Sequence, residues 1–299
     1  MGAESRPKFL GLEIRATDIL LLTALLLFTL LSLFFPSRVK DWPGVILMNV
    51  LAVFIYWTAN FLRQRSRKRL VKFLLRTASV QLLLLYLYKV SLLLQQVFFT
   101  HWNDQAVLDL EQHLFGGQPT IWMQRIMSPG LTEWLLFCYV FYVPIYPILS
   151  AIIYYKHGEK EMEDYLFYLG LAVVLSGIGF MFSRVAGPMH KIGPLYSVPL
   201  RGYVFTAIGE YIRSHVHMPG GAFPSIHCAA ASIMWWMAYR YSRDSFYVLA
   251  PVILSLYIST VYGRYHYLVD VIGGIIVAFI IMALGYVLIE DPNQAKVKR

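Results

Sequence analysis

Long apolar runs alternate with short polar segments along most of the chain. A helix that crosses a bilayer needs about 20 predominantly apolar residues, because the hydrocarbon core is about 30 Å thick. Eight runs reach or approach that length, at residues 18–35, 44–62, 71–98, 131–155, 164–183, 226–241, 246–262 and 269–290. The pattern predicts an all-α, polytopic membrane protein, a helical bundle with about eight transmembrane helices.

Two long stretches between these runs are not predicted to span. Residues 99–130 mix aromatic, acidic and apolar positions, which is typical of a segment that lies along the membrane surface. Residues 184–225 carry arginines, histidines, glycines and prolines. The sequence has no internal repeat and no linker, so a single helical membrane domain is the simplest interpretation.

The composition agrees with a membrane protein rather than a large soluble domain. The chain is 58% hydrophobic and 14% charged, whereas soluble domains carry about 25% charged residues. The formal net charge is +9, but the basic residues lie mostly between the apolar runs, where they anchor on anionic lipid head groups. We therefore predict membrane lipid as the partner and no nucleic acid; nothing in the pattern indicates an oligomeric state.

The basic residues also predict an orientation. With eight spans, the side that holds both termini carries sixteen of them: Arg6, Lys8, Arg15, Arg63, Arg65, Arg67, Lys68, Arg69, Lys72, Lys156, Lys160, Arg240, Arg243, Lys296, Lys298 and Arg299. The other side carries eight: Arg38, Lys40, Arg125, Arg184, Lys191, Arg201, Arg213 and Arg264. The positive-inside rule places the richer side in the cytoplasm. Seven of the eight histidines, all except His157, then face the periplasm, the extracellular side or an organelle lumen.

A first candidate motif, Gly221-Ala222-Phe223-Pro224-Ser225-Ile226-His227, precedes the sixth run. Ser225 is placed to cap the following helix. The free N–H groups of a helix N-terminus bind anions, and His227 falls in the first turn, within reach of such an anion. An ordinary capped helix with a buried histidine is the alternative interpretation.

A second motif, Tyr262-Gly263-Arg264-Tyr265-His266-Tyr267-Leu268-Val269-Asp270, precedes the eighth run. His266 and Asp270 are four residues apart, so on a helix they share a face and the carboxylate can orient the imidazole. The other ring nitrogen is then available as a nucleophile. Arg264 is near enough to bind the same phosphate. The alternative is a His–Asp pair that only stabilises a helix end.

Two other chemistries are weaker candidates. His227, His266 and Asp270 provide three potential zinc ligands. However, the sequence has no His-Glu-x-x-His pattern, and an arginine beside the ligands opposes a cation. Cys228 follows His227, but neighbours on a helix point about 100° apart, which is poor geometry for a Cys–His pair. We predict neither a metal nor another cofactor.

Together these residues resemble a known family. Pro224-Ser225-Ile226-His227 and the segment from Ser259 to Asp270 are similar to the second and third motifs of the type 2 phosphatidic acid phosphatase superfamily. The resemblance covers roughly residues 100–290. The Arg-Tyr-His-Tyr-x-x-Asp form, with Phe115-Gly116-Gly117-Gln118-Pro119 and Ala186-Gly187-Pro188 upstream, is closest to the inositol phosphorylceramide synthase and sphingomyelin synthase branch.

The resemblance implies a role for each residue. His266 would be the nucleophile that forms a phosphohistidine, Asp270 would orient it, and His227 would protonate the leaving group. Ser225 and Arg264 would hold phosphate oxygens, without a metal. It also implies a lipid phosphatase- or phosphotransferase-like membrane domain at residues 71–299, with a six-helix core, and an accessory transmembrane hairpin at residues 1–70.

The sequence departs from the family pattern in two places. The first phosphatase motif, a lysine six residues before Arg-Pro, is absent, and the Ser-Arg pair that opens the third motif reads Ser259-Thr260. Arg264 would replace the second of these cations, and Arg184 or Lys191 the first. The alternative for Arg184 and Lys191 is anchoring at the membrane interface.

The leading hypothesis is therefore an integral-membrane phosphotransferase or phosphatase that acts on a lipid phosphate or phosphodiester. The second substrate would be water in a phosphatase, and a small alcohol or a lipid acceptor in a transferase. A polyprenyl diphosphate phosphatase stays open as an alternative. So does a non-catalytic lipid-binding or transport protein, in which the intramembrane charges Arg76 and Lys89 would line a pathway.

Overall fold

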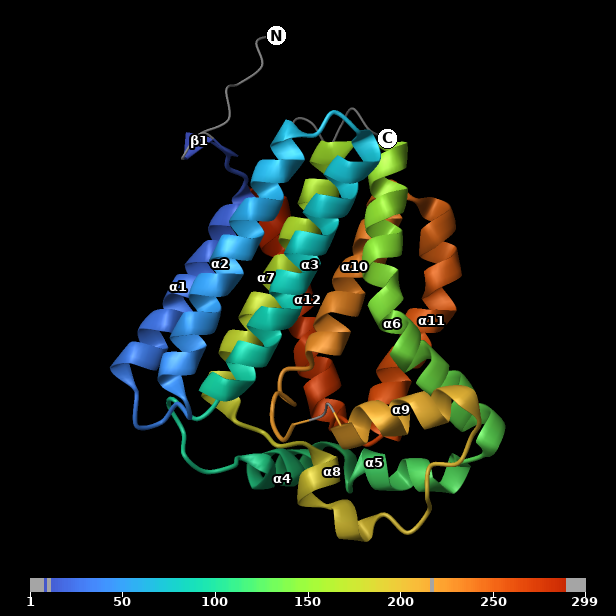
Figure 1. Cartoon of the computed structure of the whole chain (residues 1–299). Helices are drawn as coiled ribbons and strands as arrows, with labels where there is room; N and C mark the ends of the chain where they lie inside the picture. Colours follow the sequence, from blue (N-terminus) through green and yellow to red (C-terminus); the bar gives the residue numbers. More distant parts are fainter. Residues whose placement is uncertain (1–7, 10–11, 216–217, 289–299) are drawn as a thin grey trace.

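The computed structural model describes residues 8–9, 12–215 and 218–288, and they form a bundle of helices (Figure 1). Within these residues, seven helices are long and apolar enough to cross a membrane. They are α1 (Ala16–Phe34), α2 (Trp42–Arg65), α3 (Arg69–Leu94), α6 (Pro129–Lys156), α7 (Glu159–Ser183), α11 (Arg243–Tyr262) and α12 (Leu268–Leu288). Each coincides with a predicted span, so the all-α polytopic fold is confirmed.

The eighth predicted span is α10 (Ile226–Tyr241), which is shorter than the others. Its 16 residues extend about 24 Å at 1.5 Å per residue, less than the hydrocarbon thickness of about 30 Å. The helix packs against α7, α11 and α12, and Ala229, Ile233 and Met237 are fully buried. Only Ser242 separates α10 from α11, so the two helices form a tight hairpin.

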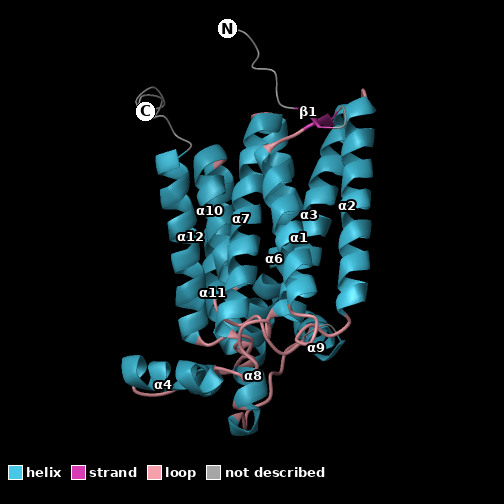
Figure 2. Ribbon diagram, turned by 90° about the vertical axis from the view of Figure 1, so that its left-hand side faces the viewer, coloured by secondary structure: helices cyan, strands magenta, loops and turns pink. Residues whose placement is uncertain are grey.

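The shorter elements lie at the two ends of this bundle (Figures 1 and 2). One end, called here the α4/α9 end, carries α4 (Asp104–Phe115), α5 (Pro119–Trp122), η1 (Met123–Ile126), α8 (Pro188–Lys191), η2 (Gly193–Leu195) and α9 (Val204–His215). The opposite end, the β1/β2 end, carries the antiparallel pair β1 (Lys8–Phe9) and β2 (Leu12–Glu13). The predicted surface segment 99–130 thus lies across one end of the bundle.

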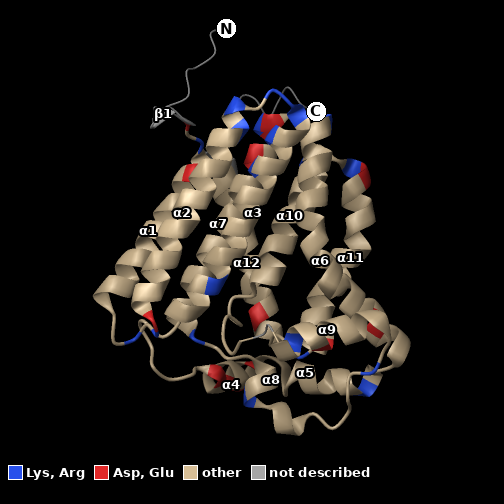
Figure 3. Cartoon of the chain, in the orientation of Figure 1, with Lys and Arg blue, Asp and Glu red and all other residues tan. Residues whose placement is uncertain are grey.

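The bundle is apolar both inside and outside. The eight long helices share one hydrophobic core, which includes Phe28, Leu87 and Tyr165. On the outer surface, Phe54 and Phe279 are more than 60% exposed. Lys, Arg, Asp and Glu gather mainly at the two ends (Figure 3). An apolar outer face between two charged ends is stable only in a bilayer, so the chain is an integral membrane protein.

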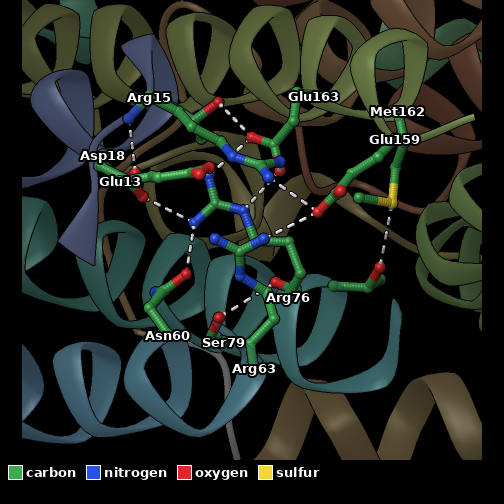
Figure 4. A network of polar contacts seen from close by, with 12 residues as sticks. Glu13, Arg15, Asp18, Asn60, Arg63, Arg76, Ser79, Glu159, Met162 and Glu163 are labelled. Carbon is green, nitrogen blue, oxygen red and sulfur yellow. Dashed lines mark hydrogen bonds and ion pairs between the residues drawn. The ribbon is translucent and has the colours of Figure 1, made fainter. Parts of the chain in front are cut away.

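A buried charge cluster joins four helices at the β1/β2 end (Figure 4). Its members are three arginines and three carboxylates: Arg15, Asp18, Arg63, Arg76, Glu159 and Glu163. At its centre, Arg76 is completely buried, and its guanidinium contacts Glu163 at 2.6 and 2.7 Å and Asp18 at 2.6 Å. Tyr56 and Asn60 accept further hydrogen bonds from Arg76.

The cluster changes the interpretation of the intramembrane charges. Arg76 is held by two carboxylates from α1 and α7, so it ties the first helix to the core of the bundle rather than lining a pathway. Lys89, on the same helix, is exposed on the bundle surface. The two basic residues that motivated the transport hypothesis therefore have different surroundings and no shared channel wall.

Replacing Arg76 by methionine should destabilise the protein by about 3–5 kcal/mol, because Asp18 and Glu163 would remain buried without their cation. The free energy of unfolding in detergent, measured by denaturant titration, tests this. Arg67→Met is the matched control, since Arg67 is an exposed arginine near the same end of the bundle. Equal stability of the two variants would show that the cluster contributes little.

The predicted orientation depends partly on Arg6, His217, Lys296, Lys298 and Arg299, which lie outside the described residues. Within the described part, α1 begins and α12 ends at the β1/β2 end, and both histidine motifs lie toward the α4/α9 end (Figure 1). The histidine motifs and the buried charge cluster therefore occupy opposite ends of the bundle.

Candidate active site

The structure brings the two motif histidines together. His227 lies in the first turn of α10, and His266 lies in the loop between α11 and α12. Nδ1 of His227 is 3.2 Å from Nε2 of His266. His266 is only 3% exposed, and His227 is half-buried. Residues 39 positions apart in the chain thus form one imidazole pair.

The hydrogen-bond partners assign the ring tautomers. Nδ1 of His266 is 2.9 Å from the carbonyl oxygen of Ala222, which only accepts, so this nitrogen carries the proton. Nε2 of His266 then presents a lone pair, and Nδ1 of His227 donates to it. The hydroxyl of Tyr139 lies 3.4 Å from Nε2 of His227. A ring nitrogen that accepts and a ring N–H that donates therefore face each other.

Asp270 contacts His266 by a different local geometry from the one predicted. Helix α12 begins at Leu268, so His266 precedes the helix and the two residues do not share a helical face. Oδ2 of Asp270 accepts the backbone N–H of Tyr267 at 2.8 Å and lies 3.4 Å from Nδ1 of His266. The fully buried carboxylate thus fixes the turn that carries the imidazole, because it also holds the backbone.

Ser225 caps α10 as predicted: its Oγ accepts the backbone N–H of Cys228 at 3.4 Å. Its own N–H donates to the carbonyl oxygen of Asp270 at 2.9 Å, which joins the first motif to the second. A side chain at Gly274 would place Cβ 2.3 Å from the carbonyl oxygen of Ser225. Glycine at this position therefore lets α12 approach the start of α10.

Arg264 lies in the loop between α11 and α12 that carries His266, and its guanidinium contacts Tyr196 and Val198. It has a left-handed backbone (φ 67°), and its guanidinium stacks on Tyr196 at 4.2 Å from the ring centroid and donates to the carbonyl oxygen of Val198. With Glu210 and Arg213 it lines a cavity of about 360 Å³. A phosphate-binding role for Arg264 stays a prediction.

The other two candidate phosphate-binding cations precede Arg264 in the chain, at the end of α7 and in α8. Arg184 ends α7 with a left-handed backbone (φ 43°). Its guanidinium contacts the side-chain oxygen of Gln96 at 3.4 Å and lies over the ring of Trp102. Lys191 is exposed on α8. A phosphate-binding role for Arg184 and Lys191 stays a prediction.

Two acidic residues of α4, which sequence reasoning missed, hold the backbone around the histidines. Asp104 accepts the backbone N–H groups of Ala186 and Gly187, both at 2.9 Å, and the hydroxyl of Tyr267 at 3.1 Å. The upstream segment Ala186–Pro188 thereby lies against the histidine loop, because the same carboxylate holds both.

Glu111, on the same helix, also accepts backbone N–H groups near the histidines. Its Oε1 accepts the backbone N–H groups of Leu268 and Val269, at 2.6 and 3.2 Å, at the start of α12. The side chain is completely buried, and burial raises the pKa of Glu111 to about 7. A signal existed in the sequence: Asp104 and Glu111 occupy the buried stripe of α4 together with Val107 and Leu108.

Glu111→Gln should remove a pH dependence of stability. Because burial raises the folded-state pKa of Glu111 from 4.5 to about 7, the folded state binds the proton more tightly. Wild-type stability should therefore fall relative to the variant as pH rises from about 4.5 to about 7, by on the order of 3 kcal/mol. Unfolding measured across this range tests it, with the exposed Asp109→Asn as the control. Parallel curves for wild type and Glu111→Gln would contradict the expectation.

An apolar cavity of about 150 Å³ reaches His227 from within the bundle. Its walls come from α3, α6, α7 and α10, and they include Tyr142 and Tyr146. Two wall residues, Leu85 and Val143, are more than half exposed on the outer surface of the bundle. The histidine pair is therefore bordered by a hydrophobic space whose walls extend to the lipid-facing surface.

The fold and the site define a class of protein: a polytopic helical membrane protein with a pair of contacting histidines at one end. A family model of the PAP2 superfamily matches residues 105–284, and the chain belongs to this superfamily. Membership makes it a membrane protein of the phosphatase or phosphotransferase kind. No curated protein and no solved structure matches the chain.

The match begins in α4 and ends in α12. It thus contains both histidine motifs and Glu111, whereas Asp104 lies one residue before it and α1, α2 and α3 precede it. In the described part of the chain, no three His, Cys, Asp or Glu side chains gather as a metal site.

Proposed function

We propose that the protein transfers the phosphoryl or phosphodiester group of a membrane lipid through a phosphohistidine on His266. The observation that carries the proposal is the contact between Nε2 of His266 and Nδ1 of His227, 3.2 Å apart. The Ala222 carbonyl and Asp270 hold the Nδ1 proton of His266. Nε2 of His266 is left as the nucleophile.

The two steps follow from the tautomers. His227 starts as an imidazolium, protonated on both ring nitrogens. Nε2 of His266 bonds to phosphorus while the bond from phosphorus to the leaving oxygen breaks, and the Nδ1 proton of His227 passes to that oxygen, which leaves His227 neutral. Water or an alcohol then gives its proton to Nδ1 of His227 and attacks phosphorus, and the phosphorus–nitrogen bond breaks. Phosphate must enter between the two rings, so their nitrogens must separate to about 6 Å on binding.

The negative charge on the phosphoryl group during transfer must be stabilised by hydrogen-bond donors around it. The N-terminus of α10, capped by Ser225, supplies N–H groups and a positive dipole end. Arg264, two residues before His266, supplies a guanidinium. Arg184 and Lys191 are the further candidates. This arrangement requires no metal.

The apolar cavity beside His227 supports a lipid as the substrate, because the hydrophobic chain can stay in the membrane while phosphate reaches the imidazoles. The sequence resemblance favours the inositol phosphorylceramide synthase and sphingomyelin synthase branch, and hence a transferase. We propose that the histidine end faces the extracytoplasmic side, on the basis of the positive-inside rule. Residues 1–70 would be an accessory hairpin to the catalytic domain at residues 71–299.

Labelled lipid donors test the function. The purified protein is incubated with phosphatidic acid, a polyprenyl diphosphate or a phosphodiester lipid, each with and without inositol or diacylglycerol. Free phosphate indicates a phosphatase, and a new lipid indicates a transferase. Activity that survives chelators supports the metal-independent route. Lipid binding without turnover across the panel would contradict the proposal and favour the non-catalytic alternative.

A further inference from the structure

Two adjoining hollows lie between α1 and α7, at and below the β1/β2 end. The first, called here the head cavity, measures about 370 Å³, and its wall includes Arg15, Lys160, Glu163 and Asp164. The second, the apolar groove, measures about 450 Å³ and follows the bundle surface. Ala16 and Phe167 line both hollows, so they are continuous.

The apolar groove has the dimensions of one acyl chain. Its α1 wall extends from Ala16 to Leu27, which is about 16 Å of helix at 1.5 Å per residue. That is about half of a 30 Å hydrocarbon core, and thus one leaflet. Val174 and Ile178 form part of the opposite wall. The groove therefore begins at the charged end of the bundle and ends near the bilayer centre.

The head cavity presents one cation and one anion that the charge cluster does not use. Arg15 and Glu163 are paired within the cluster. Lys160 is exposed, and no carboxylate in the described part of the chain lies within ion-pair distance of it. Asp164, one turn further along α7, accepts a hydrogen bond from Tyr241 with Oδ2. In the described part of the chain, Oδ1 of Asp164 accepts no hydrogen bond.

We propose that the head cavity and the apolar groove bind one phospholipid with a zwitterionic head group, from the leaflet at the β1/β2 end. Lys160 holds the phosphate, Asp164 holds the amine or quaternary ammonium, and one acyl chain fills the groove. A head group with only negative charge offers Asp164 no cation and meets the nearby Glu163. The matched pair of opposite charges therefore selects a head group that carries both signs.

This site is separate from the histidine pair, which lies at the other end of the bundle, so it does not depend on the proposed catalytic function. The lipid bridges α1, which precedes the region matched to the PAP2 superfamily, and α7, which lies within it. A bound lipid then adds to the buried charge cluster in holding the first helix against the core.

Native mass spectrometry of the full chain in detergent tests the site, with equal amounts of phosphatidylethanolamine, phosphatidylcholine or phosphatidylglycerol added. We expect one tightly retained molecule of either zwitterionic lipid, and weaker retention of phosphatidylglycerol. Lys160→Gln and Asp164→Asn should each lower the apparent affinity about tenfold, the effect of losing one charge-assisted hydrogen bond. Thr23→Trp should abolish retention, because Thr23 lines the groove on its exposed side.

Two matched variants separate a specific site from lipid that merely surrounds the bundle. Lys156→Gln removes an exposed lysine near the same end, and Leu26→Trp adds the same bulk on a lipid-facing position of α1 outside the groove. Both should retain lipid as wild type does, and size-exclusion chromatography checks that every variant is folded. Retention of all three lipids to the same extent, or wild-type retention by Thr23→Trp, would overturn the proposal.

Discussion

Replacing His266 by alanine should lower turnover of the lipid substrate by at least about 10⁴-fold, because the covalent route loses the only atom that bonds to phosphorus. Nε2 of His266 faces the neighbouring imidazole with its lone pair, since Nδ1 is held by the Ala222 carbonyl at 2.9 Å. The measurement is release of labelled phosphate or formation of a new lipid by purified protein. KM should change less than kcat, because the imidazole acts mainly in the bond-forming step.

The covalent intermediate provides an independent readout of the same prediction. Wild-type protein quenched during turnover with a labelled donor should retain an acid-labile label, and His266→Ala should retain none. His101→Ala is the matched control, because His101 is an exposed histidine at the same end of the bundle, and it should behave as wild type. Full activity of His266→Ala, or a label that persists in it, would exclude His266 as the nucleophile.

The long helices could be predicted because hydrocarbon imposes a simple rule. Every backbone polar group in a bilayer must be satisfied within the helix, so apolar length alone identifies a span. That rule identified α10 as well, although its 16 residues are fewer than a span requires. The tight link at Ser242 also followed from the sequence, because only a short polar segment separates two apolar runs there.

The site was only partly predictable, because its geometry depends on contacts between distant segments. The motifs identified His227 and His266, but the carbonyl of Ala222 as a partner of His266 depends on how the loop before α10 folds back. The spacing of His266 and Asp270 suggested that the two share a helical face. In the structure α12 begins only at Leu268, after His266. The carboxylate of Glu111 accepts the backbone N–H groups of Leu268 and Val269 at this helix start.

The acidic residues of α4 show what sequence patterns omit. Asp104 and Glu111 were part of an amphipathic segment, and charged positions in such a segment normally face water or lipid head groups. Here both face inward and receive backbone N–H groups. Their position in the apolar stripe of α4 was the available signal, but their partners come from segments about 80 and 160 residues away. Contacts with distant segments therefore determine that these two carboxylates hold backbone rather than face water.

Replacing His227 by asparagine should impair two proton transfers, and the substrate decides which one limits the rate. A lipid alcohol is a poor leaving group that needs the Nδ1 proton of His227, so lipid turnover should fall about 10²–10⁴-fold, the usual contribution of general acid catalysis. Little phosphohistidine should then accumulate, because its formation is the slow step.

With p-nitrophenyl phosphate the leaving phenolate needs no proton, so the first step of His227→Asn should proceed at close to the wild-type rate. The second step still lacks the base that activates water. The variant should therefore release about one equivalent of nitrophenol in a burst and then turn over slowly, with the label retained on His266. Rapid-quench kinetics measures the burst. A similar loss of turnover on both substrates, without a burst, would show that His227 orients or binds phosphate rather than transferring protons. The loss of a proton donor should slow the lipid alcohol much more than nitrophenolate, because only the alcohol needs a proton to leave.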